Sequence, residues 1–112
     1  MKNWFFSLFK KRYQRPAMYI LLRQDLSIMY KNVQAAHALA QYAIEYPEQF
    51  KLWNNQLIFL GVRNLIELKE WNVKLGIAGV QYSYFTEPDL DGQLTAIAYY
   101  GTGEIFKKLN LA

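Results

Sequence analysis

The sequence has no cysteine and only one histidine among its 112 residues, and these scarcities limit its chemistry. Without cysteine there is no disulfide, no thiol nucleophile and no cysteine-ligated metal. His37 alone cannot build a histidine cluster around a metal, and a Ser–His pair would have no other histidine to use. We therefore expect no metal and no cofactor. The composition also fits the reducing cytoplasm, where we place the protein.

Long hydrophobic runs are missing as well. No stretch approaches the length of a transmembrane helix, and there is no internal repeat or low-complexity segment. Apolar residues make up 53% of the chain and aromatic residues 17%, which argues against disorder. We expect one folded domain that buries a core without a covalent staple.

The first 16 residues differ in character from those that follow. Four large apolar side chains would share one side of a short helix: Trp4, Phe5, Leu8 and Phe9. A basic cluster comes next: Lys10, Lys11, Arg12 and Arg15. We therefore divide the chain into an amphipathic basic extension, residues 1–16, and an α/β domain, residues 17–112. The extension lacks a small-residue cleavage site and is a poor signal peptide. It either folds back over its aromatic residues or lets residues 1–12 contact a membrane surface.

The stretch from residue 18 to residue 44 organises the domain. Met18 to Leu22 is a short apolar run suited to a buried strand. From Met29 the small apolar residues recur at helical spacing, and we expect this face to pack on a sheet: Val33, Ala36, Ala40 and Ile44. A polar stripe recurs on another face: Tyr30, Gln34, His37 and Gln41. The expected unit is a strand feeding a helix.

Further elements follow in alternation. We expect strands at residues 56–62, 80–84 and 94–100, a loop at 47–55, a helix from Asn64 to about Gly76, and a last helix at 102–109. Asn64 and Glu67 have the spacing of a reciprocal capping pair. The order predicts a three-layer α/β/α domain with a four-stranded mixed, mainly parallel sheet. Parallel first and third strands would bring Arg23, Asp25 and the start of the first helix near Glu87.

The segment from Glu87 to Gly92 begins like a calcium loop. Its closing acidic ligand would fall at Ala98, so the pattern fails and predicts no metal. It is then either a solvated turn bent by Pro88 and Gly92, or a loop that presents a carboxylate, from Glu87 or Asp89, as a base or water anchor.

Two motifs carry a resemblance to a known family. Arg23-x-Asp25-Leu26, followed by Gln34-x-x-His37-Ala38, resembles the opening of the archaeal and eukaryotic-type (second) peptidyl-tRNA hydrolases. The segment 87–98 is similar to the version in divergent bacterial and phage-encoded relatives. The resemblance spans about residues 17–100 and implies hydrolysis of the ester that joins a peptide to tRNA.

The resemblance also implies roles for particular residues. The family's catalytic acid follows the third strand, where Glu87 lies nearest and Asp89 is the rival. Gln34 and Thr95 correspond to a site glutamine and threonine that would stabilise charge on the carbonyl oxygen. The substrate-binding residues would be Arg23, Asp25, Tyr30 and His37. From the neighbouring residues in the sequence alone, however, we first expect His37 to be a buried, hydrogen-bonded histidine and Thr95 to be an ordinary strand threonine.

The chain departs from the family at its lysine. Relatives carry a lysine four residues before the glutamine, and that position is Tyr30 here. Lys31 is one residue later, about 100° around a helix, and its long stem would have to reach the same place. Lys31 is therefore the candidate for the catalytic role of the family's lysine, and Tyr30 would line the pocket beside it, stacking on the terminal adenine or donating its hydroxyl. In the purely structural alternative, Lys31 lies in solvent and Tyr30 packs over the start of the helix.

The expected partner is tRNA, with a net charge of +4 and a pI near 9.3 that favour a polyanion mildly. The basic residues are equally compatible with a solvated face. A non-catalytic tRNA- or protein-binding module of the same fold is the alternative function. The oligomeric state is open, a homodimer included.

Overall fold

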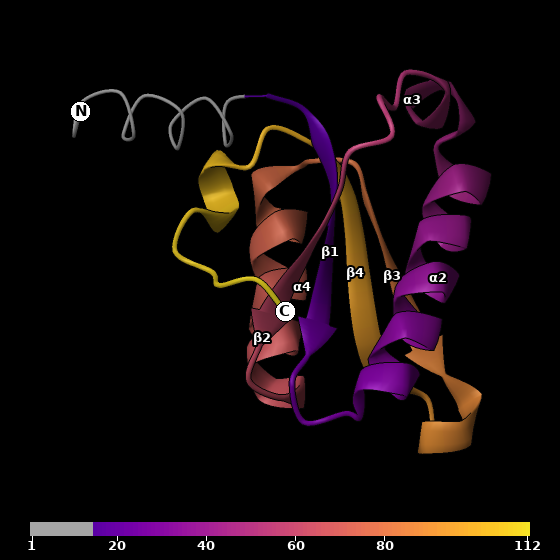
Figure 1. The fold of residues 1–112 in the computed structure, drawn as a ribbon, viewed down its shortest axis with the longest axis vertical. Helices are drawn as coiled ribbons and strands as arrows, with labels where there is room; N and C mark the ends of the chain where they lie inside the picture. The colour runs from indigo at the N-terminus through magenta and orange to yellow at the C-terminus, as the bar shows by residue number, and fades with distance from the viewer. Residues whose placement is uncertain (1–14) are drawn as a thin grey trace.

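The computed structural model describes residues 15–112, in which a central sheet is flanked by two long helices (Figure 1). The elements in chain order are β1 Ala17–Arg23, α2 Ile28–Glu45, α3 Pro47–Lys51, β2 Leu57–Val62, α4 Leu65–Ala78, β3 Tyr82–Glu87, the 3-10 turn η1 Pro88–Leu90, β4 Gln93–Gly101 and the 3-10 turn η2 Glu104–Phe106. The expectations for residues 1–14, a folded-back helix and the membrane contact of residues 1–12, lie outside the described residues. Within residues 15–112, no helix is long and apolar enough to cross a membrane.

The four strands form a mixed sheet in the order β2-β1-β4-β3. β1 pairs with β2 in parallel and with β4 antiparallel, and β3 pairs antiparallel with β4. Only one of the three neighbouring pairs is parallel, so the expected mainly parallel sheet is not confirmed. The directions still place the carboxyl ends of β1 and β3 at the same end of the sheet, because both run opposite to β4. This is the shared rim that the sequence predicts.

β1 occupies the middle of the core, and all seven of its residues are buried. Because side chains alternate along a strand, Tyr19 and Leu21 belong to an apolar cluster that includes Leu68 and Leu75 of α4. Met18, Ile20 and Leu22 belong to a second cluster, with Ala35, Ala38 and Tyr42 of α2. A strand with both faces covered reads as a continuous apolar run, which explains its sequence.

α2 turns a different face to the sheet from the one predicted. Its buried residues are Gln34, Ala35, Ala38 and Tyr42. The residues expected to pack on the sheet are exposed instead: Val33, Ala36, Ala40 and Ile44. The predicted packing face is therefore wrong. The orientation is fixed by a buried polar contact of Gln34 and by Tyr42, which fills the second cluster.

Three boundary predictions need correction. Residues 47–51 form α3 where a loop was expected, because proline suits the first turn of a helix. Phe50 and Trp53 pack against the second cluster. α4 continues past Gly76 to Ala78, and Gly79 ends it in the left-handed conformation at φ 71°. The expected last helix is reduced to η2, whose Phe106 is buried.

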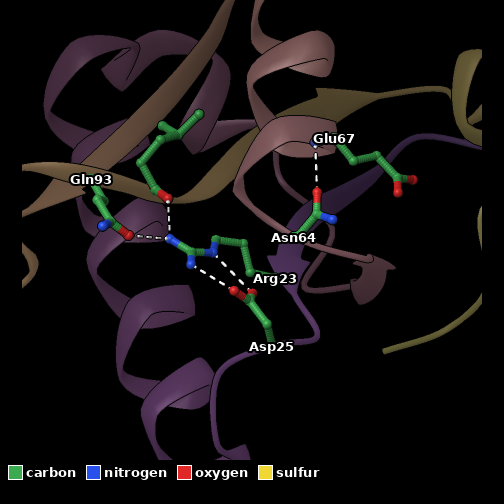
Figure 2. Close-up of polar contacts among 6 residues, drawn as sticks. Arg23, Asp25, Asn64, Glu67 and Gln93 are labelled. Atoms are coloured by element: carbon green, nitrogen blue, oxygen red, sulfur yellow. Dashed lines mark hydrogen bonds and ion pairs between the residues drawn. The ribbon is translucent and has the colours of Figure 1, made fainter.

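The start of α4 shows half of the predicted capping pair. The backbone N–H of Glu67 donates to Asn64 Oδ1 at 3.0 Å, as expected (Figure 2). The Glu67 carboxylate does not return to the N–H of Asn64. It accepts instead from the backbone N–H of Arg63 at 3.1 Å and from Arg63 Nε at 2.7 Å.

Candidate active site

The candidate site is built around Glu87, the last residue of β3. Glu87 is only 9% exposed although η1 carries the chain out into a turn directly after it. The backbone carbonyl of Glu87 accepts from the N–H of Gly92 at 3.0 Å, and Gly92 has φ 75°, a value that suits glycine. The predicted turn is thus a closed loop whose base holds a largely buried carboxylate.

A β-bulge explains how Thr95 comes to face α2. Phe85 is opposite Ala96 and Thr86 is opposite Leu94, so Thr95 is an extra residue in β4. Leu94 belongs to the cluster beneath α4 and Ala96 to the cluster beneath α2. The Thr95 side chain contacts α2, so two consecutive residues, Thr95 and Ala96, face the same helix. Without the bulge, strict alternation would turn Thr95 away from α2.

A chain of hydrogen bonds joins the two motifs. Thr95 Oγ1 donates to Gln34 Oε1 at 2.6 Å. Gln34 Nε2 in turn donates to Glu87 Oε1 at 3.1 Å. Thr95 and Gln34 are both fully buried, so in this structure the Thr95 hydroxyl bonds to Gln34 and the Gln34 amide bonds to Glu87. They are placed to orient the carboxylate, and the carbonyl-binding role that the resemblance implies for them stays a prediction.

Tyr30 completes the surroundings of the carboxylate at the rim. Its backbone N–H donates to the Ser27 side chain at the start of α2, at 3.2 Å. Its hydroxyl donates to Glu87 Oε1 at 3.4 Å, a long bond. Burial and the neighbouring Glu87 carboxylate raise the pKa of the Tyr30 hydroxyl, which keeps it a donor at neutral pH. No hydrogen bond from residues 15–112 reaches Glu87 Oε2.

Lys31 does not join this group. Its ammonium donates to Gln24 Oε1 at 2.6 Å, in the loop between β1 and α2. One helical position separates Lys31 from Tyr30, and the resulting turn of about 100° directs the two side chains to different neighbours. Tyr30 therefore occupies the place beside Glu87 that the family resemblance would give to a lysine.

The Arg23 guanidinium forms its hydrogen bonds with other residues of this chain (Figure 2). Arg23 Nε and Nη2 donate to the two carboxylate oxygens of Asp25 at 3.0 Å and 2.7 Å. Arg23 Nη1 donates to Gln93 Oε1 at 3.0 Å and to the Leu94 carbonyl at 3.2 Å. The hydrogen bond from Arg23 lowers the pKa of Asp25. A buried guanidinium with four such contacts joins β1 to the start of β4. Arg23 and Asp25 are therefore placed as a clamp at the rim, and not as a free phosphate site.

His37 and Asp89 are both exposed. The expectation of a buried, hydrogen-bonded histidine is wrong, because the His37 ring stacks on Phe85 with ring centroids 4.4 Å apart and an angle of 8° between the planes. Asp89 lies in η1 and makes no hydrogen bond or ion pair within the described part of the chain. Glu87, and not Asp89, is the acid that the fold brings to Gln34.

Two contributing residues carry no sequence signal. Gln93, which accepts a hydrogen bond from Arg23, lies in the segment 87–98 but has no role assigned there, and Phe85, on which His37 stacks, belongs to no motif; their partners are distant in the sequence. Among residues 15–112, no three acidic or histidine side chains are grouped to hold a metal ion. A surface depression of about 230 Å³ is lined by residues that include Arg63, Trp71 and Lys74, so it belongs to α4 and not to Glu87.

Comparison with known proteins supports the fold. No protein-family model matches the chain, and no curated protein matches it. A solved structure of a protein of unknown function from Agrobacterium tumefaciens aligns with a TM-score of 0.66 at 12% sequence identity, covering 87% of this chain and 97% of that one. At this identity the likeness concerns the fold alone.

Proposed function

We propose that this protein hydrolyses the ester bond of peptidyl-tRNA and releases peptide and free tRNA. One observation carries the proposal: a largely buried carboxylate, Glu87, is held at the rim by Gln34 and Tyr30, which lie in the stretch resembling the peptidyl-tRNA hydrolases. We also propose that the protein is located in the cytoplasm, where tRNA is found. We further propose a three-layer α/β/α arrangement, which is supported by the apolar clusters on either side of β1.

Glu87 serves as the general base in this mechanism. Two donors hold Oε1, which leaves Oε2 to accept a proton from water. The water oxygen bonds to the ester carbonyl carbon while its proton passes to Glu87. The bond from that carbon to the ribose 3′ oxygen then breaks, and the proton moves from Glu87 to this leaving oxygen. The products are a peptide with a free carboxyl group and tRNA with a free 3′ hydroxyl.

Tyr30 stabilises the charge that develops on the carbonyl oxygen. Its hydroxyl is protonated at neutral pH, and its 3.4 Å bond to Glu87 is long enough to be exchanged for a bond to substrate. Gln34 and Thr95 act as positioning residues, since both are buried behind the carboxylate. Lys31 would have to leave Gln24 to reach the substrate, and it is the weaker candidate.

Phosphate contacts hold the tRNA. Because Arg23 is committed to Asp25, Gln93 and Leu94, we assign these contacts to Lys31 and to the basic residues of the extension, Lys10, Lys11, Arg12 and Arg15. Each phosphate that is neutralised adds about 0.7 to 0.9 to the slope of log affinity against log salt concentration. His37 presents an exposed ring stacked on Phe85, and a base of the tRNA end would stack on this ring.

The alternative is a binding module that has the fold without the reaction. The observation that favours it is Tyr30 in the place of the family's lysine, with Lys31 bonded to Gln24. Such a module would bind tRNA, or a protein, and leave the ester intact.

One experiment separates the two functions. Purified protein is incubated with N-acetylaminoacyl-tRNA, release of the acetylated amino acid is followed, and affinity for uncharged tRNA is measured across salt concentrations. The hydrolase proposal predicts release well above the rate without enzyme, together with salt-dependent binding. Salt-dependent binding without release would establish the binding module, and neither release nor binding would remove tRNA from the account.

A further inference from the structure

Gln93, the first residue of β4, lies between the Arg23 clamp and Glu87. Its side-chain oxygen Oε1 accepts from Arg23 Nη1 at 3.0 Å. Gln93 is also the residue directly opposite Glu87 in the antiparallel pairing of β3 with β4. Because β4 is the strand between β1 and β3, Gln93 has Arg23 on one side and Glu87 on the other.

The Gln93 side chain starts from the same face of the sheet as the Glu87 carboxylate. Residues directly opposite one another in an antiparallel pair share a face, with Cβ atoms about 4.5 to 5.5 Å apart. Glu87 is on the α2 face, since its carboxylate accepts from Gln34. The next residue of β4, Leu94, belongs to the cluster beneath α4, as alternation along the strand requires. Gln93 is therefore a neighbour of the carboxylate at the rim.

The contact with Arg23 determines which way the Gln93 amide points. A guanidinium can only donate hydrogen bonds, so Gln93 must present its oxygen to Arg23. The amide nitrogen Nε2 then lies on the side away from the guanidinium (Figure 2). No hydrogen bond among residues 15–112 uses this nitrogen. Gln93 is half-buried, so its N–H donors remain open to a molecule bound at the rim.

The Arg23 guanidinium is itself fixed, which keeps the amide from turning over. Its Nε and Nη2 donate to the two carboxylate oxygens of Asp25 at 3.0 Å and 2.7 Å, so Nη1 is the atom that faces Gln93. A reversed amide would place its N–H groups against those of the guanidinium and leave its oxygen without this donor. The donor of Gln93 is thus oriented before any substrate binds, which is the arrangement that stabilises developing charge most effectively.

The two glutamines near Glu87 differ in what they can offer to a substrate. Gln34 is fully buried, its oxygen accepts from Thr95, and its nitrogen donates to Glu87. Gln93 is half-buried and uses only its oxygen within residues 15–112. Gln93 is therefore the glutamine that is placed to contact a substrate.

We propose that Gln93 is a further catalytic residue of this site, whose amide nitrogen donates to the carbonyl oxygen of the ester while Arg23 and Asp25 hold the amide in position. This inference rests on the hydrolase function proposed above. When the water oxygen bonds to the carbonyl carbon, an electron pair of the C=O bond moves to the carbonyl oxygen, where negative charge develops. Tyr30 from α2 and Gln93 from β4 donate to this oxygen. The electron pair returns as the ribose oxygen leaves, and both donors keep their protons.

Two substitutions at residue 93 separate a catalytic donor from a residue that only completes the clamp. Gln93→Glu keeps the shape and the acceptor for Arg23 but has no N–H group, so its melting temperature should not fall. Gln93→Met also lacks the donor, adds no charge, and removes the acceptor, so its melting temperature should fall. We expect kcat for N-acetylaminoacyl-tRNA to drop about a hundredfold or more in both variants. Gln81→Glu, at an exposed glutamine just before β3, is the control for added charge and should keep wild-type kcat.

Each other pattern of kcat would overturn the proposal. A loss in Gln93→Met alone, together with its lower melting temperature, would make Gln93 a structural part of the clamp. A loss in Gln93→Glu alone would be an effect of the added negative charge. Wild-type kcat in both variants would exclude any part of Gln93 in the reaction.

A binding measurement distinguishes failure of this inference from failure of the proposed function. The probe is a short RNA that copies the 3′ end of tRNA and carries an N-acetylated amino acid through an amide, which keeps the carbonyl oxygen in place of the ester. The side-chain amide signal of Gln93 in a nitrogen-15 NMR spectrum, assigned by its absence from Gln93→Glu, should shift with this probe and not with the same RNA lacking the amino acid. Binding of the probe without this shift would overturn the inference alone. A wild-type protein that neither binds the probe nor releases acetylated amino acid would remove the proposed function, and the inference with it.

Discussion

Gln34 and Glu87 are 53 residues apart in the sequence, yet the amide of one donates to the carboxylate of the other at 3.1 Å. The contact links the middle of α2 to the end of β3. It exists because β1, which leads into α2, runs in the same direction as β3 and ends at the same rim. Everything proposed for the reaction depends on this pair.

Thr95→Val should weaken both the fold and the placement of Glu87. Valine has the shape of threonine but lacks the hydroxyl, so the buried Gln34 Oε1 loses its donor, at a cost of about 1 to 3 kcal/mol of unfolding free energy. Turnover should fall as well, with a change in its pH profile, because Gln34 no longer orients the base. Thr86→Val, at an exposed position on β3, is the control and should change stability by less than about 0.5 kcal/mol. Equal stability of the two variants would contradict the role of Thr95.

Tyr30→Phe and Lys31→Ala test which residue stands in for the family's lysine. We expect Tyr30→Phe to lower kcat about tenfold or more while KM stays near the wild-type value, since the hydroxyl acts on the developing charge. Lys31→Ala should leave kcat within about twofold, a difference of less than about 0.5 kcal/mol in the barrier. Melting temperatures confirm that both variants are folded. The reverse pattern would assign the role to Lys31.

The clamp formed by Arg23 and Asp25 predicts a loss of stability in acid. The hydrogen bond from Arg23 lowers the pKa of Asp25 below its ordinary value of 3.8. The pair therefore contributes stability above about pH 4, and this contribution is lost as the pH falls through the lowered value of the folded state. Urea unfolding between pH 2 and pH 6 should show a shallower pH dependence for Asp25→Asn than for wild type. Asp91→Asn, in the exposed loop after η1, should keep the wild-type dependence.

Tyr42 predicts the opposite trend in alkali. Burial raises the pKa of its hydroxyl to about 12, while a tyrosine in the unfolded chain has the ordinary value of 10.0. The unfolded state ionises first, so the contribution to stability is intact below pH 10 and is lost as the pH rises toward 12. Tyr42→Phe should reduce the loss of unfolding free energy over this range by about 1 to 3 kcal/mol.

Tyr100→Phe is the control for this prediction, because the Tyr100 hydroxyl donates to the carbonyl of Leu52 at 3.0 Å. This variant should lose a hydrogen bond at neutral pH and keep the alkaline dependence of the wild type. Identical pH profiles for Tyr42→Phe and wild type between pH 9 and pH 12 would contradict the account.

The sequence predicts that the start of the helix carrying Gln34 lies near Glu87, because this depends only on strand direction and on the order of the elements. It does not predict how Thr95 joins them, because a β-bulge leaves no mark in a run of apolar residues. The sequence also predicts the wrong face of α2 to pack on the sheet. The regular apolar spacing belongs to the exposed side of this helix, and the side that packs on the sheet includes a glutamine whose partners lie on two other strands.

The contacts of Arg23 could also be predicted only in part from the sequence. Its contact with Asp25 is local and lies within one motif, but Gln93 is 70 residues away and reaches it through the pairing of β1 with β4. The resemblance places Arg23 among the expected substrate-binding residues, whereas in the structure its guanidinium bonds to Asp25, Gln93 and Leu94. Contacts that depend on the register of two strands cannot be read from either strand alone.

The most direct test of the central claim is hydrolysis of N-acetylaminoacyl-tRNA by wild type, Glu87→Gln and Asp89→Asn side by side. Glutamine keeps the shape of Glu87 and removes its ability to accept a proton, so the account predicts a loss of turnover of about a hundredfold or more with tRNA binding preserved. Asp89→Asn, at the exposed acid of the same loop, should keep wild-type turnover. Loss in Asp89→Asn with full activity in Glu87→Gln, or unchanged turnover in both variants, would contradict the assignment of Glu87 as the catalytic base.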